Sequence, residues 1–229
     1  MEIVDLSQEF YPGMPVFTGH PEFAMKIAVT HEQRAGNLNA TTHSPVVHAI
    51  QITEHAGTHV DAFNHFGAEW LEQDITTMPL EMFITRGICL DLSDKTLLEI
   101  IEPQDIEAAA RKDSLKIEPG DTVLLYTDHY RRHFGTDQWT NGPGISTDTA
   151  RWFGEQKVSA FAVETRSPGV IGVSNMDVHT SGGQLSYTHY ENLINLHLLI
   201  GRGPFRFIGL PLKIRGGTGS PVRAVAIFE

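Results

Sequence analysis

Short apolar runs that contain β-branched residues recur along most of the chain. Runs of this composition, bounded by polar and turn-forming residues, predict strands. The predicted strands are Glu2–Leu6, Lys26–Thr30, Val46–Thr53, Ile84–Leu92, Thr122–Tyr126, Ala160–Val163, Phe205–Gly209 and Val222–Phe228.

Three other segments carry signals for the start of a helix. Pro103 suits a first helical turn, Ser146 suits an N-cap, and Thr188 with Glu191 fits a capping box. The predicted helices are Gln104–Lys112, the segment from Ser146 to Gln156, and Asn192–Ile200 with Gly201 as its stop.

Strands therefore outnumber helices, which predicts a mixed α/β or α+β fold. The chain has 229 residues and contains no repeat, low-complexity segment or linker-like stretch. A chain of this length fits one large domain better than two small ones, so we expect residues 1–229 to form a single domain.

The charge balance limits the class of partner. Twenty-eight acidic residues against 17 basic ones give a formal net charge of −11, which argues against nucleic acid or an anionic membrane surface. We expect a cytoplasmic protein, because no signal peptide or membrane-spanning apolar run is present. The single cysteine, Cys89, lies in an apolar run and is expected to be a buried hydrophobe.

Twelve histidines are the unusual feature of the composition, and three of them stand close together. His55, His59, Asp61 and His65 follow the spacing H-x3-H-x-D-x3-H. On a helix Asp61 would point away from the first two histidines, whereas in an extended segment all four residues share one face. A straight strand would place the α-carbons of His55 and His59 about 13 Å apart, so we expect a bend at Gly57.

Two imidazoles and one carboxylate suit zinc, manganese or iron(II). Three protein ligands leave a coordination position for water, which is typical of a catalytic site. The alternative for any one of these histidines is an ordinary core or loop residue.

The segment His55-Ala-Gly-Thr-His59-Val-Asp61-Ala-x-x-His65 resembles the signature of the cyclase family of metal-dependent hydrolases, which includes bacterial kynurenine formamidase and isatin hydrolase. The resemblance extends to residues 12–21, similar to the family's active-site loop, and to residues 210–226, similar to its last loop and strand. It implies the family's swivelling β/β/α type of domain. Phe63 stands where the family usually has proline.

The resemblance also implies roles for the matched positions. His55, His59 and Asp61 would bind the first metal, and His65 would be the general acid–base. A second metal would use Asp61 with His179 and Glu191. His189 is a rival to His179, but it lies too close to Glu191 for the family spacing. The cofactor would be one or two divalent ions per chain, zinc first and manganese as the alternative.

The function implied is hydrolysis of a carbon–nitrogen bond in an aryl formamide or a cyclic amide, by water that the metal activates. Phe63, Phe66 and Trp70 flank the signature and are candidate walls of a pocket for an aromatic or cyclic small molecule, although they are equally suited to the core. Lactone hydrolysis, a ring-closing dehydration and a non-catalytic metal- or ligand-binding protein remain alternatives. A homodimer or homotetramer is expected by resemblance.

Overall fold

The computed structural model describes residues 1–38 and 45–229 of the chain. These residues form thirteen strands, six α-helices and three short 3-10 helices. The strands are β1 (Glu2–Asp5), β2 (Ala24–Val29), β3 (Val47–Gln51), β4 (His59–Asp61), β5 (Ile84–Asp91), β6 (Ile100–Ile101), β7 (Thr122–Tyr126), β8 (Gly144–Ile145), β9 (Ala160–Val163), β10 (Thr188–Glu191), β11 (Phe205–Ile208), β12 (Gly219–Pro221) and β13 (Val225–Phe228). The helices are α1 (His31–Leu38), α2 (Phe63–Phe66), α3 (Pro103–Lys112), α4 (His129–His133), α5 (Thr147–Glu155) and α6 (Asn175–Leu185), with 3-10 helices η1 (Ala68–Trp70), η2 (Leu80–Phe83) and η3 (Leu196–Leu198).

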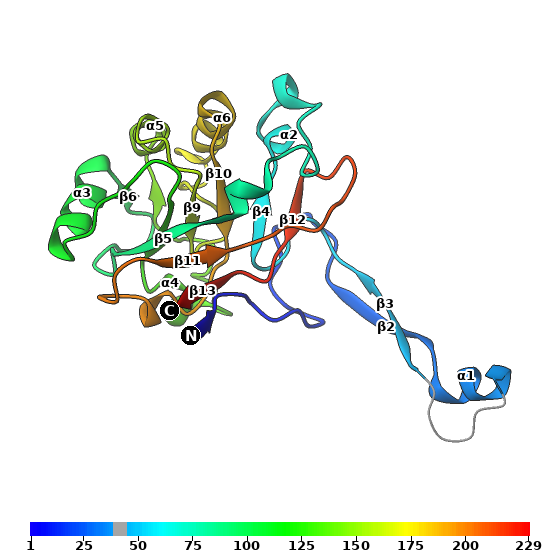
Figure 1. Ribbon diagram of the computed structural model, residues 1–229. Coiled ribbons are helices and arrows are strands. Elements are labelled where there is room, and N and C mark those ends of the chain that lie inside the picture. The colour runs from blue at the N-terminus through cyan, green and yellow to red at the C-terminus, as the bar shows by residue number, and fades with distance from the viewer. Residues whose placement is uncertain (39–44) are drawn as a thin grey trace.

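Nine of the strands form one mixed sheet in the order β1-β13-β11-β5-β7-β9-β10-β4-β12. The four strands from β5 to β10 are parallel, and the strands on both sides of them pair antiparallel. Helices α3, α5 and α6 lie along one face of the sheet (Figure 1). The prediction of a mixed α/β fold with more strands than helices is confirmed.

Side chains of the central strands alternate between two apolar clusters, one on each face of the sheet. On the helix-covered face, Ile88 and Leu90 of β5 join Val123 and Leu125 of β7. On the opposite face, Cys89 of β5 lies in the other cluster, where it is 2% exposed, as expected of a buried hydrophobe. Burial of both faces explains why these strands are nearly continuous apolar runs in the sequence.

All eight predicted strands are present, with ends shifted by a few residues. Two predicted helices are also confirmed as α3 and α5, and Ser146 caps α5 by accepting a hydrogen bond from the Thr149 amide at 3.0 Å. None of the described helices is long and apolar enough to cross a membrane.

The third helix prediction is wrong. Thr188–Glu191 forms strand β10, which pairs parallel with β9 and antiparallel with β4. The Thr188 hydroxyl, which the capping box would have directed to its own backbone, donates instead to the carbonyl of Asp61 at 2.6 Å. Of the expected helix after Glu191, only the single turn η3 exists, so tertiary pairing outweighs the local capping signal.

Helix α6 was not predicted because its sequence contains poor helix formers. Gly182 and Gly183 are required by the close approach of α2 and η1, since an added Cβ would lie 3.0 Å from Phe66 and 2.8 Å from Trp70. Close packing against these rings brings α6, with His179, next to the segment that contains His65.

Candidate metal centre

Strand β4 and the loop before it supply the first residues of the site. Gly57 adopts φ +57°, a left-handed conformation that bends the chain between His55 and His59 as the spacing predicted. The space beside it also excludes a side chain, because an added Cβ would lie 2.9 Å from the ring of Phe10. His59 and Asp61 follow on β4, and both are almost fully buried.

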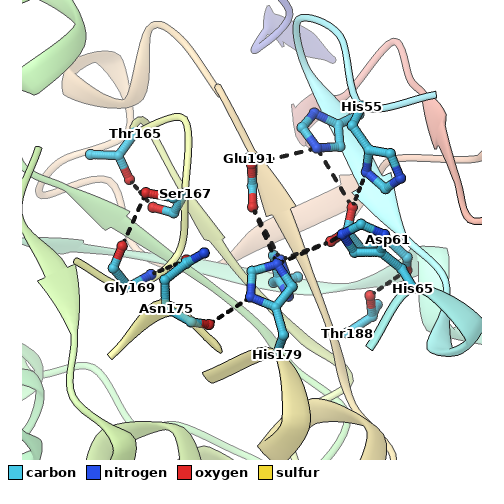
Figure 2. A network of polar contacts seen from close by, with 12 residues as sticks. His55, Asp61, His65, Thr165, Ser167, Gly169, Asn175, His179, Thr188 and Glu191 are labelled. Carbon is cyan, nitrogen blue, oxygen red and sulfur yellow. Dashed lines mark hydrogen bonds and ion pairs between the residues drawn. The ribbon is translucent and has the colours of Figure 1, made fainter. Parts of the chain in front are cut away.

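The neighbours of β4 complete the base of the site. On one side Glu191 of β10 pairs with His59, and on the other Gly219 of β12 pairs with Asp61. His189 precedes Glu191 by two residues on β10, so its side chain shares the face of Glu191. His65 comes from α2 and His179 from α6. Figure 2 shows the side chains of the labelled members pointing toward one another.

Asp61 lies at the centre of this cluster, and its two oxygens face different partners. Oδ1 lies 2.8 Å from Nδ1 of His55 and 3.5 Å from Nε2 of His59. Ligand atoms of these three residues are close enough together to hold one ion, and we call them the first group.

Oδ2 of Asp61 faces a second set of ligand atoms, which we call the second group: Asp61, His179, His189 and Glu191. Oδ2 lies 3.6 Å from Nε2 of His179 and 3.2 Å from Nε2 of His189. Oε1 of Glu191 lies 4.0 Å and 3.3 Å from the same two nitrogens, while its Oε2 lies 3.5 Å from Nε2 of His59. Both carboxylates therefore face both groups.

Hydrogen bonds outside the cluster orient three of the imidazoles. Nδ1 of His59 donates to the carbonyl of Gly57 at 2.8 Å, and Nδ1 of His179 donates to the carbonyl of Asn175 at 2.7 Å. A carbonyl can only accept, so each Nδ1 holds the proton and each Nε2 presents a lone pair to the cluster. Figure 2 shows the contact between Asn175 and His179.

His55 is oriented in the opposite sense. The Thr218 hydroxyl donates its proton to Oε2 of Glu54 at 2.6 Å, so it accepts from Nε2 of His55 at 2.9 Å. Nδ1 of His55 then presents its lone pair to Oδ1 of Asp61 at 2.8 Å. Two acceptor atoms this close need a cation or a proton between them.

Burial and the two carboxylates shape the protonation of the cluster. Burial lowers the pKa of His59 to about 3 and that of His179 to about 4, which keeps both imidazoles neutral, as ligands must be. Burial opposes the charge of His189 as well, but Asp61 and Glu191 raise its pKa to about 9. Burial also raises the pKa of Glu191 to about 7.

The donor set fits a divalent cation. Oδ2 of Asp61 and both ring nitrogens of His189 are buried and make no hydrogen bond of good geometry with the described residues. Unpaired buried polar atoms of this kind are costly unless an ion satisfies them. Imidazole nitrogens and carboxylate oxygens are the ligands that zinc and manganese accept.

A cavity of about 270 Å³ opens onto the cluster. Its walls include Phe66, together with Phe17 from the N-terminal loop and Trp139. Neither Phe63 nor Trp70 lines this cavity. Phe63 is buried in the apolar core, and Trp70 packs against that core and the glycines of α6.

Sequence reasoning missed two residues of this site. The family spacing favours His179 over His189, although His189 and Glu191 are two residues apart and therefore share one face of strand β10. Arg166 lines the cavity, and its guanidinium carbon lies 4.4 Å from the centre of the Phe17 ring. Nothing in its sequence context signalled this position.

Comparison with known proteins decides the family. The Cyclase family model matches residues 4–170. The chain belongs to the cyclase family. It is 23% identical over 225 residues to a kynurenine formamidase from Bacillus cereus, covering 98% of this chain and 96% of the relative. It is also 23% identical over 244 residues to an isatin hydrolase from Roseibium aggregatum, covering 99% and 92%.

A solved structure agrees with this assignment. Isatin hydrolase A from Ralstonia solanacearum superposes with a TM-score of 0.84 at 25% identity, covering all of this chain and 92% of that one. The resemblance inferred from the histidine signature is thus confirmed, and the two chains have the same fold over their whole shared length.

Proposed function

We propose that this protein is a metal-dependent hydrolase that cleaves a carbon–nitrogen bond in an aryl formamide or a cyclic amide. The observation that carries the proposal is the convergence of His55, His59, Asp61, His179 and Glu191 with His65 at one cavity. The named activities of the relatives in the cyclase family support the same class of reaction.

The first group is proposed to hold the catalytic ion, and a second ion is proposed beside His179 and Glu191. Zinc is the first candidate and manganese the second, since both accept imidazole and carboxylate ligands. When bound, a divalent ion lowers the pKa of a coordinated water and polarises the substrate carbonyl.

His65 is proposed to move the proton. Its Nε2 lies 3.7 Å from Oδ2 of Asp61, and its side chain is 36% exposed, so it faces both the cluster and the cavity. Burial lowers its pKa below the ordinary value despite the nearby Asp61. A neutral His65 is therefore available near pH 7 to accept a proton from water and to return it to the leaving nitrogen.

The walls of the cavity favour a planar substrate. Phe17, Phe66 and Trp139 offer aromatic surfaces, and the guanidinium of Arg166 offers hydrogen-bond donors beside them. We propose that Arg166 binds a carbonyl or carboxylate oxygen of the substrate. Its Nε is buried without a hydrogen-bond partner among the described residues, which leaves that donor unused.

Metal analysis of the purified protein, followed by a spectrophotometric panel of N-formylkynurenine, isatin and simple lactones, tests the proposal. We expect bound metal and turnover of an amide substrate that is lost on chelation and restored by zinc or manganese. Turnover of lactones alone would favour the lactone-hydrolase alternative. A metal-free protein that turns over none of these compounds would leave a non-catalytic binding protein as the remaining interpretation.

We also propose that the chain acts as one domain within a homo-oligomer. The pairing of β1 with β13 joins the two ends of the chain, which supports one domain. The hairpin of β2 and β3 projects from the sheet (Figure 1) and exposes Met25, Ile27 and Ile50, at 49%, 59% and 60%, which supports association through this arm. Light scattering on the protein as it elutes from a size-exclusion column measures the oligomeric state.

We also propose a cytoplasmic location. Cys89 is buried and forms no disulfide, which is compatible with that location.

A further inference from the structure

His189 also belongs to this cluster. It is not part of the histidine signature, and the family spacing that places His179 and Glu191 in the site does not include it. It is 1% exposed, and both of its ring nitrogens lack a hydrogen bond of good geometry within the described part of the chain. Its ring is held between the parallel faces of Phe66 and Phe161, each with a centroid distance of 5.4 Å. These stacking contacts fix the direction in which Nε2 points.

The two distances from Nε2 of His189 to the carboxylate oxygens match the spacing of ligand atoms around a tetrahedral zinc ion, and those from His179 are longer. A zinc ion bound at about 2.0–2.1 Å by four ligands holds neighbouring ligand atoms about 3.4 Å apart. Nε2 of His189 lies 3.2 Å from Oδ2 of Asp61 and 3.3 Å from Oε1 of Glu191. Nε2 of His179 lies 3.6 Å and 4.0 Å from the same two oxygens.

We propose that His189 is a protein ligand of the second ion, so that Asp61, His179, His189 and Glu191 close its coordination shell. This inference rests on the proposed function for the presence of metal and adds one ligand to it. A site with four protein ligands is typical of a structural ion, whereas three ligands leave room for water. The first group, with His55, His59 and Asp61, is then the one open to water and substrate.

The rival arrangement has no second ion. His189 would then carry a proton and stand as a cation between Asp61 and Glu191, in the place that the ion would occupy. The two arrangements differ in metal stoichiometry, which is measurable independently of turnover.

The test compares His189→Leu with wild type after removal of metal and equilibrium dialysis against zinc, with content measured by mass spectrometry. Leucine keeps an apolar side chain between the two phenylalanine rings but removes the ligand. We expect two ions per wild-type chain and one per His189→Leu chain. Loss of a hydrogen-bond partner of a metal ligand typically costs 10- to 100-fold in metal affinity, and loss of the ligand itself should lower the affinity of the second site by more than that. His48→Leu, at an exposed histidine of β3, is the matched control and should keep two ions.

A second variant and a second measurement cover the case in which leucine disturbs folding. His189→Gln offers an amide oxygen near the position of Nε2 and should keep a second ion with weaker affinity. Cobalt in a four-coordinate site absorbs in the visible range, so on titration of the metal-free protein we expect the absorbance to rise up to two equivalents of cobalt in wild type and up to one in His189→Leu.

Two ions in both wild type and His189→Leu, at equal affinity, would overturn the proposal. One ion in wild type would also overturn it and favour the protonated His189. Amide turnover that persists in either case would leave the proposed function standing, whereas a wild-type protein without metal or turnover would remove both together.

Discussion

Thr218→Val is expected to weaken metal binding at the first group without touching a ligand. The Thr218 hydroxyl accepts from Nε2 of His55 at 2.9 Å and donates to Glu54 at 2.6 Å. It thereby holds the His55 proton on Nε2 and leaves Nδ1 free, 2.8 Å from Asp61. Valine has nearly the same shape but can neither accept nor donate.

The size of the effect follows from the role of such partners. Hydrogen-bond partners of ligating histidines typically contribute 10- to 100-fold to metal affinity, or about 1.4–2.7 kcal/mol. The His55 side chain is 13% exposed, so water replaces the lost hydroxyl only in part. We therefore expect the upper part of this range, roughly 30- to 100-fold weaker binding.

Competition with a chromophoric chelator measures this change, ion by ion. Thr218→Ser is the matched control, because serine keeps the hydroxyl and should retain most of the wild-type affinity. Both variants should have the melting temperature of wild type. If Thr218→Val then binds metal as tightly as wild type, the hydrogen bond from His55 to Thr218 does not contribute to metal affinity, and this prediction is refuted.

Three further predictions address the proton, the substrate and the buried core. His65→Ala should abolish turnover while metal content stays at the wild-type level; loss of metal would instead make His65 a ligand. Because burial lowers the pKa of His65, the acidic limb of kcat/KM in wild type should lie below the ordinary histidine value of about 6.5, and a limb above it would contradict the assigned role. Arg166→Met should raise KM for amide substrates with little change in kcat or metal content, whereas equal loss in kcat would place Arg166 in the chemical step. Glu164 accepts from the amide and hydroxyl of Thr127, and burial raises its pKa to about 7 from 4.5. The carboxyl of Glu164 therefore binds its proton more tightly in the folded state than in the unfolded state. The stability that this tighter proton binding contributes is lost as the pH rises from about 4.5 to 7. Glu164→Gln should then be more stable than wild type at pH 8 by up to about 3 kcal/mol, and equally stable at pH 4; denaturant unfolding at the two pH values measures the difference, and equal stability at pH 8 would refute the raised pKa.

The central strands were predictable because both of their faces are buried. Burial of both faces makes each strand a continuous apolar run, which can be recognised in the sequence without knowledge of the fold. Helices α3 and α5 carry their own start signals, Pro103 and Ser146. Helix α6 has no such signal, and its glycines make sense only beside the rings of Phe66 and Trp70. Phe63 illustrates the same limit, since an aromatic residue next to the signature suits the core as well as the cavity.

The candidate site depends on two kinds of information, and the sequence displays only one of them. The face of a strand on which a side chain lies follows from the local sequence, because alternate residues share a face. His59 and Asp61 therefore share a face of β4, and His189 and Glu191 share a face of β10. Register is not local. The antiparallel pairing of Glu191 with His59 sets the two strands opposite each other, and directly opposed residues have Cβ atoms about 4.5–5.5 Å apart. This single pairing brings both carboxylates between the histidines of two strands that are distant in the sequence. The family spacing favours His179 over His189, whereas the strand β10 places His189 and Glu191 on the same face, because they are two residues apart.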